Sequence, residues 1–418
     1  MGYTENLIDF IGKSTDCYHA VKTAKDRLDE NGFTELFEGD KWDVQNDGKY
    51  YVIRNSSSII AFEMPKKDFG AFMICASHTD SPSFKLKPDF EINADGCIKL
   101  SVEGYGGMIM SSWLDRPLSI SGRIVTAKDG KVETKLVNID RDLLVIPSLA
   151  IHMSRDINKG YEFNIRRDMC PIASEKNGRI EDIIAENVGV DKEEILGFDL
   201  SLYNRMRGTV LGADGEYFSA PRIDDLQCMY STLEGFLNSE SDDNVTVFAA
   251  FDNEEVGSGT KQGAKSSFLR DVLERICNNS ETYKRAVAKS FMLSCDNAHA
   301  VHPNFADKSD GTNRVYMNGG IVIKYNANQR YTTDAVSEAV VKYVCKNAGV
   351  PYQMYANRSD IPGGSTLGNL SNEKVSLNTA DIGLAQLAMH SSYETAGSRD
   401  TEYMVKMIKE FYKTEIVL

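Results

Sequence analysis

Two neighbouring glutamates, Glu254 and Glu255, follow an apolar stretch in the segment FAAFDNEEVG, residues 248–257. Adjacent carboxylates repel each other, and consecutive side chains at the end of a strand point to opposite faces. Either both glutamates are solvated surface charges, or each has its own chemical task. The answer depends on whether other parts of the chain supply partners for them.

Histidines and carboxylates occupy similar positions in four further segments, MICASHTDSP, SAPRIDDLQC, FMLSCDNAHAVHP and LAQLAMHSSYE. The side chains that these segments offer are His78 with Asp80, Asp224 with Asp225, Asp296, and His390. Each segment alone is typical of an ordinary loop or a helix N-cap. Together they form a set of histidines and carboxylates without cysteine, which suits Zn²⁺ or Mn²⁺ at a hydrolytic site.

The elements that would carry these segments predict an α/β fold. Residues 69–80, 244–252 and 288–298 are apolar runs that end in polar loops, as buried strands do. Helical patterns alternate with them after Pro221, for example over residues 224–238. Loops at the carboxyl ends of parallel strands meet at one edge of a sheet, where ligands bind. We therefore expect a mixed sheet flanked by helices, with the polar segments gathered at one edge.

The stretch between Lys87 and Ser219 has a different pattern. Short alternating runs separated by Asp-Gly or Gly turns predict a series of hairpins, interrupted by helical, acidic residues over 174–200. The simplest architecture is a catalytic domain of residues 1–86 and 219–418 that is interrupted by an inserted β-rich domain of residues 87–218.

The composition and charge of the chain indicate which partners it can bind and where in the cell it is expected. Hydrophobic residues make up 42% and charged residues 26% of the chain, which is ordinary for a globular protein. The net charge of −14 argues against a nucleic-acid partner. The N-terminus lacks a secretory signal, and no run approaches the ~18–20 apolar residues that cross a bilayer. We expect a cytoplasmic protein without membrane attachment.

Seven segments, in register along nearly the whole chain, closely resemble the motifs of the aspartyl aminopeptidase family, the M18 metallopeptidases. These segments are SHTDSP, PRIDDLQ, FDNEEVGS, SCDNAHAVHPN, IKYNANQRY, NRSDIPGGSTLG and DIGLAQLAMHSSYE. The resemblance implies a zinc-peptidase fold whose inserted domain mediates dimerisation. It also implies a centre of two divalent metal ions, normally zinc, with manganese or cobalt as alternatives.

The resemblance assigns the metal ligands by motif position. His78 and Asp296 match the ligands of one metal, and Glu255 and His390 match those of the other. Asp224 occupies the bridging position between them. Two such ions bind a water or hydroxide between them and polarise the scissile carbonyl. Their positive charge would also relieve the repulsion between the neighbouring glutamates.

The two glutamates then have different tasks. A carboxylate that coordinates a metal is a poor proton acceptor, so we expect Glu254, beside the ligand Glu255, to act as general base and then as general acid. Asp80 lies two residues beyond His78, where the family has the carboxylate that orients the ligand imidazole.

Substrate selection falls to two further residues. A free N-terminal amine would bind at the metal centre, which makes the enzyme an exopeptidase that acts on peptides. An acidic first residue needs a fixed cation, and Lys324 in IKYNANQRY occupies that family position. His152 matches a family histidine that reaches the substrate of a neighbouring subunit, although Ser148 stands where the family often has a second histidine.

The family assembles as a tetrahedral dodecamer built from dimers, and we expect the same homo-oligomer here. The favoured hypothesis is an aminopeptidase that removes N-terminal Asp or Glu from peptides. Two alternatives stay open: an aminopeptidase of the same fold with broad or neutral preference, and an inactive assembly protein. The inactive protein is the weaker alternative, because all six expected ligand and base positions are filled.

Overall fold

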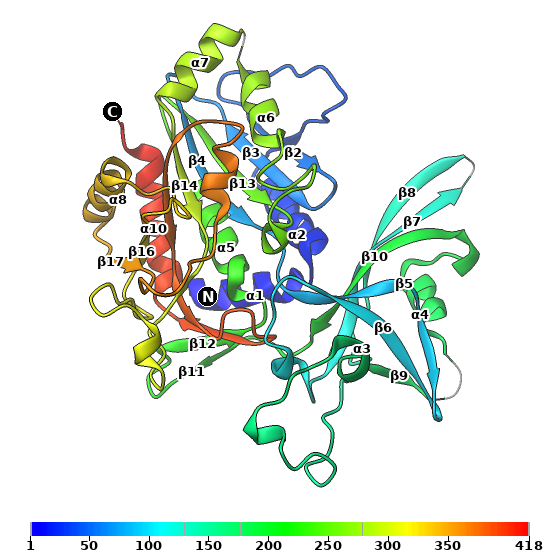
Figure 1. Cartoon of the computed structure of the whole chain (residues 1–418). Helices are drawn as coiled ribbons and strands as arrows, with labels where there is room; N and C mark the ends of the chain where they lie inside the picture. The colour runs from blue at the N-terminus through cyan, green and yellow to red at the C-terminus, as the bar shows by residue number, and fades with distance from the viewer. Residues whose placement is uncertain (1, 129, 176–177, 278, 417–418) are drawn as a thin grey trace.

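The computed structural model describes residues 2–128, 130–175, 178–277 and 279–416, and its strands form three sheets (Figure 1). The largest sheet has nine strands, in the spatial order β1 (Thr34–Glu35), β2 (Lys49–Arg54), β3 (Ser58–Glu63), β13 (Val245–Phe251), β4 (Phe72–His78), β14 (Phe291–Cys295), β18 (Asn378–Gly383), β16 (Ile321–Tyr325) and β17 (Tyr352–Ala356). Neighbouring strands are parallel from β13 to β18, and antiparallel pairs lie on either side of this centre. The mixed sheet expected from the sequence is confirmed.

The central strands are apolar on both sides because helices cover both faces of the sheet. In β4, Met73 and Cys75 pack into one core, whereas Phe72 and Ile74 pack into the other. This alternation is the two-residue period of a strand. A strand that is buried on both faces reads as a continuous apolar run, which explains the pattern of residues 69–80.

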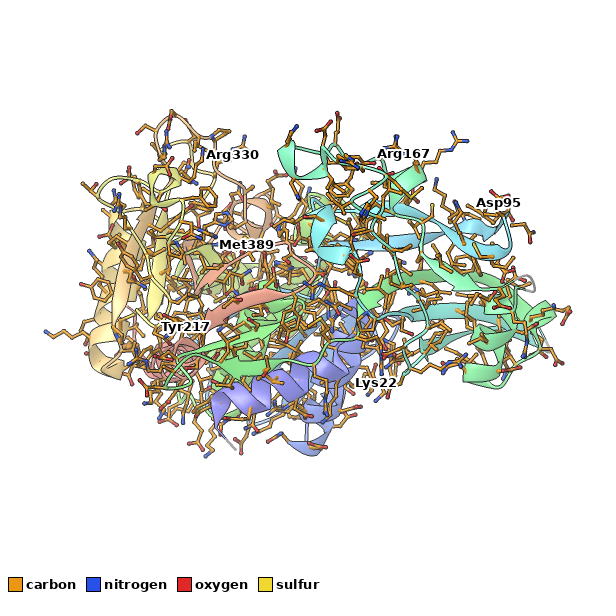
Figure 2. All side chains as sticks on the ribbon, turned by 90° about the horizontal axis from the view of Figure 1, so that it is seen from below. Lys22, Asp95, Arg167, Tyr217, Arg330 and Met389 are labelled. Carbon is orange, nitrogen blue, oxygen red and sulfur yellow. The ribbon has the colours of Figure 1, made fainter. Side chains whose placement is uncertain are left out.

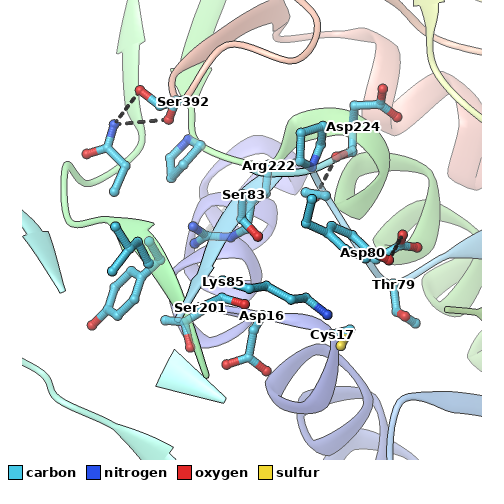
Figure 3. A pocket seen from close by; sticks show the side chains of 18 of the residues that line it. Asp16, Cys17, Thr79, Asp80, Ser83, Lys85, Ser201, Arg222, Asp224 and Ser392 are labelled. Atoms are coloured by element: carbon cyan, nitrogen blue, oxygen red, sulfur yellow. Dashed lines mark hydrogen bonds between the residues drawn. The ribbon is translucent and has the colours of Figure 1, made fainter. Parts of the chain in front are cut away.

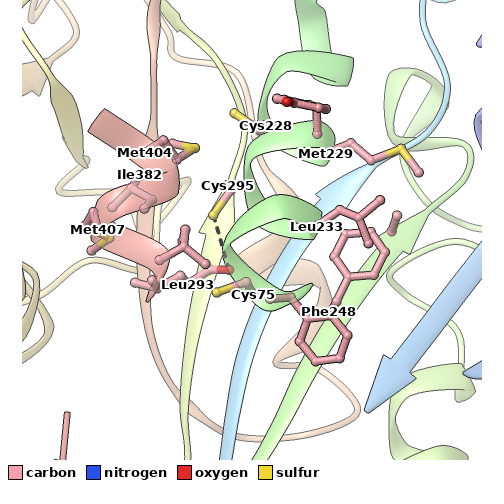
Figure 4. Packing of buried hydrophobic residues seen from close by; sticks show 14 of the residues in the cluster. Cys75, Cys228, Met229, Leu233, Phe248, Leu293, Cys295, Ile382, Met404 and Met407 are labelled. Carbon is pink, nitrogen blue, oxygen red and sulfur yellow. Dashed lines mark hydrogen bonds between the residues drawn. The ribbon is translucent and has the colours of Figure 1, made fainter. Parts of the chain in front are cut away.

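Eight helices form the two covering layers. The first core contains residues of α1 (Tyr3–Lys13), α2 (Cys17–Glu30), α5 (Ile223–Leu237), α8 (Ala335–Ala348) and α10 (Asp400–Lys413). The second contains residues of α6 (Phe268–Ile276), α7 (Ser280–Ala288) and α9 (Leu367–Ser371). Figure 4 shows part of the first core, where Leu233 of α5 and Met407 of α10 face the strand residues Cys75 and Leu293. Gly349 caps α8 with a left-handed backbone, a conformation that favours glycine at the end of a helix.

A six-stranded antiparallel sheet forms a separate layer with its own core. Its spatial order is β8 (Lys131–Asn138), β7 (Leu118–Lys128), β10 (Ile195–Asn204), β5 (Ser83–Ala94), β6 (Cys97–Tyr105) and β9 (Ile172–Ser174). Figure 2 shows this part of the chain, with Asp95 at its far end, projecting away from the part that carries Tyr217 and Met389. The sheet supports the prediction of hairpins over residues 87–218.

The helical prediction for residues 174–200 was only half right. Residues 176–177 lie outside the described part, and the α-helix α4 covers only Ile180–Val188. From Ile195 the chain enters β10, where Leu200 and Leu202 alternate into the core of the six-stranded sheet. The acidic helical composition just before it hides this two-residue period in the sequence.

The structure also contains a small third sheet, which the sequence did not predict. Its order is β11 (Thr209–Leu211), β12 (Tyr217–Ala220), β20 (Glu394–Gly397), β19 (Ala385–Leu387) and β15 (Ala298–His299). Strand β11 lies within residues 87–218 yet pairs with β12 rather than with the six-stranded sheet. The division of the chain at residues 87 and 218 stays a prediction. In the described ranges, no helix combines the length and the apolar character that a membrane span requires.

Candidate metal centre

Three parallel strands of the large sheet deliver polar side chains to one edge. His78 is the last residue of β4, which runs parallel to β13 on one side and to β14 on the other. Glu254 and Glu255 follow β13 in a short 3₁₀ turn, η4 (Glu254–Val256), and Asp296 follows β14 directly. Because the carboxyl ends of these strands are adjacent, residues far apart in the sequence meet at this edge.

Two further ligand candidates come from outside the large sheet. Asp224 lies in the first turn of α5, where its carbonyl oxygen accepts a hydrogen bond from Ser81. His390 lies in the link between β19 and β20 and adopts a positive φ of 67°. A residue other than glycine in this backbone region carries strain, so the surrounding contacts must hold His390 in place.

These side chains form overlapping clusters of potential metal ligands. One cluster comprises His78, Asp224, Asp225 and Asp296, another comprises Asp224, Glu255 and His390, and a third comprises His78, Glu254 and Glu255; within each, the ligand atoms lie within 4.8 Å of one another. Asp224 belongs to the first two, and its oxygens face different histidines. Its Oδ1 lies 3.4 Å from Nε2 of His78, and its Oδ2 lies 3.5 Å from Nε2 of His390. His390 Nε2 is also 3.3 Å from Glu255 Oε2.

The donor set fits divalent metal ions. Asp224 Oδ1 and Glu255 Oε1 are buried carboxylate oxygens that accept no hydrogen bond from any described residue. A buried carboxylate oxygen without a donor is costly, and a cation beside it removes that cost. Imidazole nitrogens with carboxylate oxygens and no thiolate are ligands that Zn²⁺, Mn²⁺ and Co²⁺ accept.

The electrostatics of the protein groups show that this cluster lacks positive charge. Burial raises the pKa of Glu255 well above its usual value, and the charge of Asp224 raises it further. Burial also raises the pKa of Asp296, against the opposing charge of Lys324. Burial lowers the pKa of His78, but the negative charge of Asp225 and the other carboxylates around the ring together outweigh it, so the net shift is strongly upward. Carboxylates therefore outnumber the cations that could balance them.

The family model of Aminopeptidase I zinc metalloproteases (M18) matches residues 10–412 of the chain. The chain belongs to the M18 family of metalloaminopeptidases. A probable M18 family aminopeptidase 2 of Clostridium acetobutylicum is 45% identical over 428 residues, which cover 98% of each chain. The protein is therefore an aminopeptidase, a hydrolase that acts at peptide N-termini.

Solved structures of M18 aminopeptidases share the whole fold. Ape4 in its complex with Nbr1 is 35% identical, with a TM-score of 0.95 over 98% of this chain and 85% of that chain. The mApe1 dodecamer of S. cerevisiae is 28% identical, with a TM-score of 0.85 over 98% of this chain and 96% of that chain. The mixed α/β fold that the sequence predicts is therefore the fold of M18 aminopeptidases.

Asp80 connects the His78 ring to the turn that carries Glu254 and Glu255. Its carboxylate accepts the backbone amides of Glu254 at 3.1 Å and Glu255 at 3.2 Å. Nδ1 of His78 is hydrogen-bonded to the backbone carbonyl oxygen of Asp80 at 3.0 Å and lies 3.5 Å from its Oδ1. Burial raises the pKa of Asp80, but the His78 ring and the hydrogen bonds that the carboxylate accepts together outweigh it, so the pKa lies below its usual value. Asp80 thus holds both the His78 ring and the turn that carries the two glutamates.

Glu254 shares this turn with Glu255 but differs from it in its contacts. Only Glu255 belongs to the cluster that contains His390. Both glutamates approach His78 in the third cluster. Burial among the neighbouring carboxylates raises the pKa of Glu254 to about 8.

The two predicted substrate residues lie in contrasting places. Lys324, at the end of β16, is buried; its ammonium donates to the carbonyl of Asn297 at 2.8 Å and lies 3.3 Å from Asp296 Oδ1. The structure therefore brings Lys324 to the M18 site. His152 is exposed in the loop between β8 and α3 and belongs to none of the clusters among the described residues.

Two carboxylates that the sequence analysis did not assign also shape the site. Asp225 belongs to the His78 cluster, and its Oδ2 accepts the backbone amide of His78 at 3.2 Å. Glu394 is buried and accepts the amides of Asp224 at 3.1 Å and His390 at 2.8 Å. Only the closeness of Glu394 to His390 in the motif MHSSYE could have suggested its role.

A small pocket lies where the six-stranded sheet meets the M18 site (Figure 3). Asp80 and Asp224 form part of its wall, together with Ser83 and Lys85 of β5 and Arg222 before α5. The other clustered ligands do not line it. The six-stranded sheet therefore borders the site.

Proposed function

We propose that this M18 aminopeptidase removes N-terminal Asp or Glu from peptides at a centre of two divalent metal ions. The ligands of this centre would be His78, Asp224, Glu255, Asp296 and His390. The observation that carries the proposal is the position of Asp224, whose two oxygens face His78 and His390 in separate clusters. A bridging carboxylate requires this arrangement.

The metal ions and the side chains of the protein would have different roles in the reaction. When bound, two divalent ions polarise the scissile carbonyl and stabilise the charge that develops on it. Glu254 would take the proton of the attacking water on a carboxylate oxygen and deliver it to the departing amine. Asp80 supports this role, because it accepts the backbone amides of both glutamates and so fixes the turn.

Lys324 supports the acidic preference. An ammonium group has three N–H donors. Asn297 and Asp296 engage two of them, which leaves a third for the side-chain carboxylate of an N-terminal Asp or Glu. The same contacts also carry the alternative: if Lys324 serves only to pair with Asp296, the enzyme has a broad or neutral preference.

Assembly into a dodecamer that is built from dimers is proposed from the likeness to the mApe1 dodecamer. The loop that carries His152 supports contact with another subunit. Leu149, Ile151 and Met153 in this loop are 51%, 48% and 75% exposed in the single chain. Neighbouring exposed apolar side chains mark an interaction surface. His152 would then reach the substrate of the adjacent subunit.

A substrate panel tests the proposed activity. The protein is stripped with a chelator, reloaded separately with Zn²⁺, Mn²⁺ or Co²⁺, and assayed on Asp, Glu, Leu, Lys and Ala aminoacyl substrates. We expect metal-dependent hydrolysis that is confined to Asp and Glu. Metal-dependent activity that is strongest on Leu or Lys would overturn the specificity while leaving the metal centre in place. Full activity after verified metal removal would overturn the metal centre.

A further inference from the structure

We propose that residues 105–112, which begin at the last residue of β6 in the six-stranded sheet, position both proposed histidine ligands of the metal centre. We call these residues the anchoring segment. They lie within the predicted insertion, so this part of the chain would act on the metal centre of its own subunit, apart from any role in assembly. The inference rests on the proposed function, because it takes His78 and His390 as metal ligands.

The first contact acts on His78 through Asp80. The hydroxyl of Tyr105 donates to Asp80 Oδ2 at 2.7 Å, and the side-chain amide of Asn253 donates to the same hydroxyl at 2.8 Å. Asn253 lies directly before the two glutamates and has a positive φ of 64°. Tyr105 therefore joins the carboxylate that contacts the His78 ring to the turn that carries Glu254.

The second set of contacts acts on the His390 loop. The ring Nδ1 of His390 is hydrogen-bonded to the carbonyl oxygen of Gly107, which leaves Nε2 directed at Asp224 and Glu255. The amide of Ile109 donates to the carbonyl of His390 at 3.0 Å. A ligand imidazole whose other nitrogen is hydrogen-bonded has a fixed tautomer and ring orientation.

The same loop is fastened a second time at Ser392. Its amide donates to Ser112 Oγ at 2.8 Å, and its hydroxyl donates to the carbonyl oxygen of Ser112 at 2.5 Å. His390 has a strained backbone with positive φ, so these bonds supply the restraint that such a conformation requires.

Gly106 brings the anchoring segment against the glutamate turn. Its φ is +71°, and a Cβ placed there would lie 3.2 Å from Cβ of Glu255. Glycine therefore permits both the backbone conformation and the close approach. Hydrogen bonds and packing from one short segment thus reach Glu255 and His390 directly and His78 through Asp80, and these residues belong to different elements.

Tyr105→Phe tests the inference by removing one hydroxyl. We expect Zn²⁺ affinity, measured by competition with a chromophoric chelator, to fall on the order of 10–100-fold, as for other groups that orient metal ligands. The visible absorption of the Co²⁺-loaded protein should also change, because it reports ligand geometry. Tyr203→Phe is the matched control: Tyr203 donates to Asn138 within the six-stranded sheet, and among the described residues its hydroxyl has no hydrogen bond to a proposed ligand.

Ser112→Ala provides a second test at the other histidine and keeps the inference open to refutation if Tyr105→Phe fails to fold. It removes the acceptor of the Ser392 amide, and we expect weaker Zn²⁺ binding. Ser111→Ala is its control, because the Ser111 side chain is exposed and makes no hydrogen bond to any described residue.

The outcomes separate this inference from the proposed function. Weaker Zn²⁺ binding in Tyr105→Phe and Ser112→Ala than in their controls, at equal melting temperatures of the metal-free proteins, would support the anchoring segment. Equal Zn²⁺ affinities in variants and controls would overturn it while the metal centre stands. Failure of the unmodified protein to bind Zn²⁺ would overturn the metal centre and the inference together.

Discussion

The ammonium of Lys324 lies 3.3 Å from the carboxylate of Asp296, and both side chains are buried. One residue is the proposed specificity cation and the other a proposed metal ligand, so substrate preference and metal binding share an ion pair. Burial lowers the pKa of Lys324, but the charge of Asp296 and smaller contributions from neighbouring groups together outweigh it, and the net shift is upward. The side chain therefore stays positively charged.

Replacing Lys324 should change preference more than it changes overall activity. Lys324→Ala leaves Asp296 without its partner, which lowers the rate on every substrate. Because this loss affects every substrate, it cancels in the ratio of kcat/KM for an Asp substrate to kcat/KM for an Ala substrate. We expect the ratio to fall by about 30-fold or more, since loss of one partner of a buried charge pair costs about 2–5 kcal/mol. An unchanged ratio would leave Lys324 as a partner of Asp296 only.

Glu254→Gln should separate catalysis from metal binding. The amide keeps the size of the side chain but accepts no proton, so kcat should fall by about 10²–10⁴-fold. Metal content, measured by atomic emission, should remain that of the unmodified protein. Because Glu254 also lies in a cluster with His78 and Glu255, this measurement decides its role. A parallel loss of metal and activity would make Glu254 a ligand.

Metal stoichiometry should distinguish the shared ligand from an unshared one. Asp224 belongs to the clusters of both histidines, whereas His390 belongs to only one cluster. We therefore expect Asp224→Ala to lose both ions and His390→Ala to retain about one per chain. Equilibrium dialysis followed by elemental analysis gives the counts. Retention of one ion in Asp224→Ala would contradict its bridging position.

The sequence predicted the strands that are buried on both faces, because their apolar runs are long and end in polar loops. It did not predict the third sheet. Strands such as β15 and β19 have only two or three residues, and β12 pairs with β20 across more than 170 positions of the chain. Such short strands depend on distant partners rather than on a local pattern.

The candidate site was predictable to the extent that its motifs are local. His78, Glu255 and the other clustered residues stand in segments with a recognisable composition. Tyr105 and Glu394 act through hydrogen bonds to distant elements, and nothing in their own segments indicates those partners. The link from Lys324 to Asp296 likewise arises only when β16 and β14 join the same sheet.

Asp334 should stabilise the start of α8 through its capping box. Its side chain accepts the amides of Val336 and Ser337, and the Ser337 hydroxyl accepts the Asp334 amide. Asp334→Ala should weaken the helix start by about 1 kcal/mol. Hydrogen exchange at the amides of Val336 and Ser337 should become faster. Asp334→Asn retains the acceptor and should preserve most of the protection; equally fast exchange in both variants would contradict the cap.

Asp400 should make the stability of the chain depend on pH. This carboxylate is fully buried and accepts the amides of Asn318 at 2.6 Å and Gly320 at 2.9 Å. Burial outweighs these hydrogen bonds and raises its pKa to about 7, above the ~3.9 of an unfolded Asp. Between these two values the folded chain binds the proton more tightly than the unfolded chain does.

The contribution of Asp400 to the free energy of unfolding is therefore largest below pH ~4 and falls as the pH rises toward 7. Asp400→Asn carries no charge at any pH and removes this dependence. Relative to the unmodified protein, its melting temperature should rise between pH 5 and pH 7.5. Because the metal centre is common to both proteins, its own pH dependence cancels in the difference. A difference that stays constant across this range would mean that the two backbone amides, rather than burial, control the ionisation of Asp400.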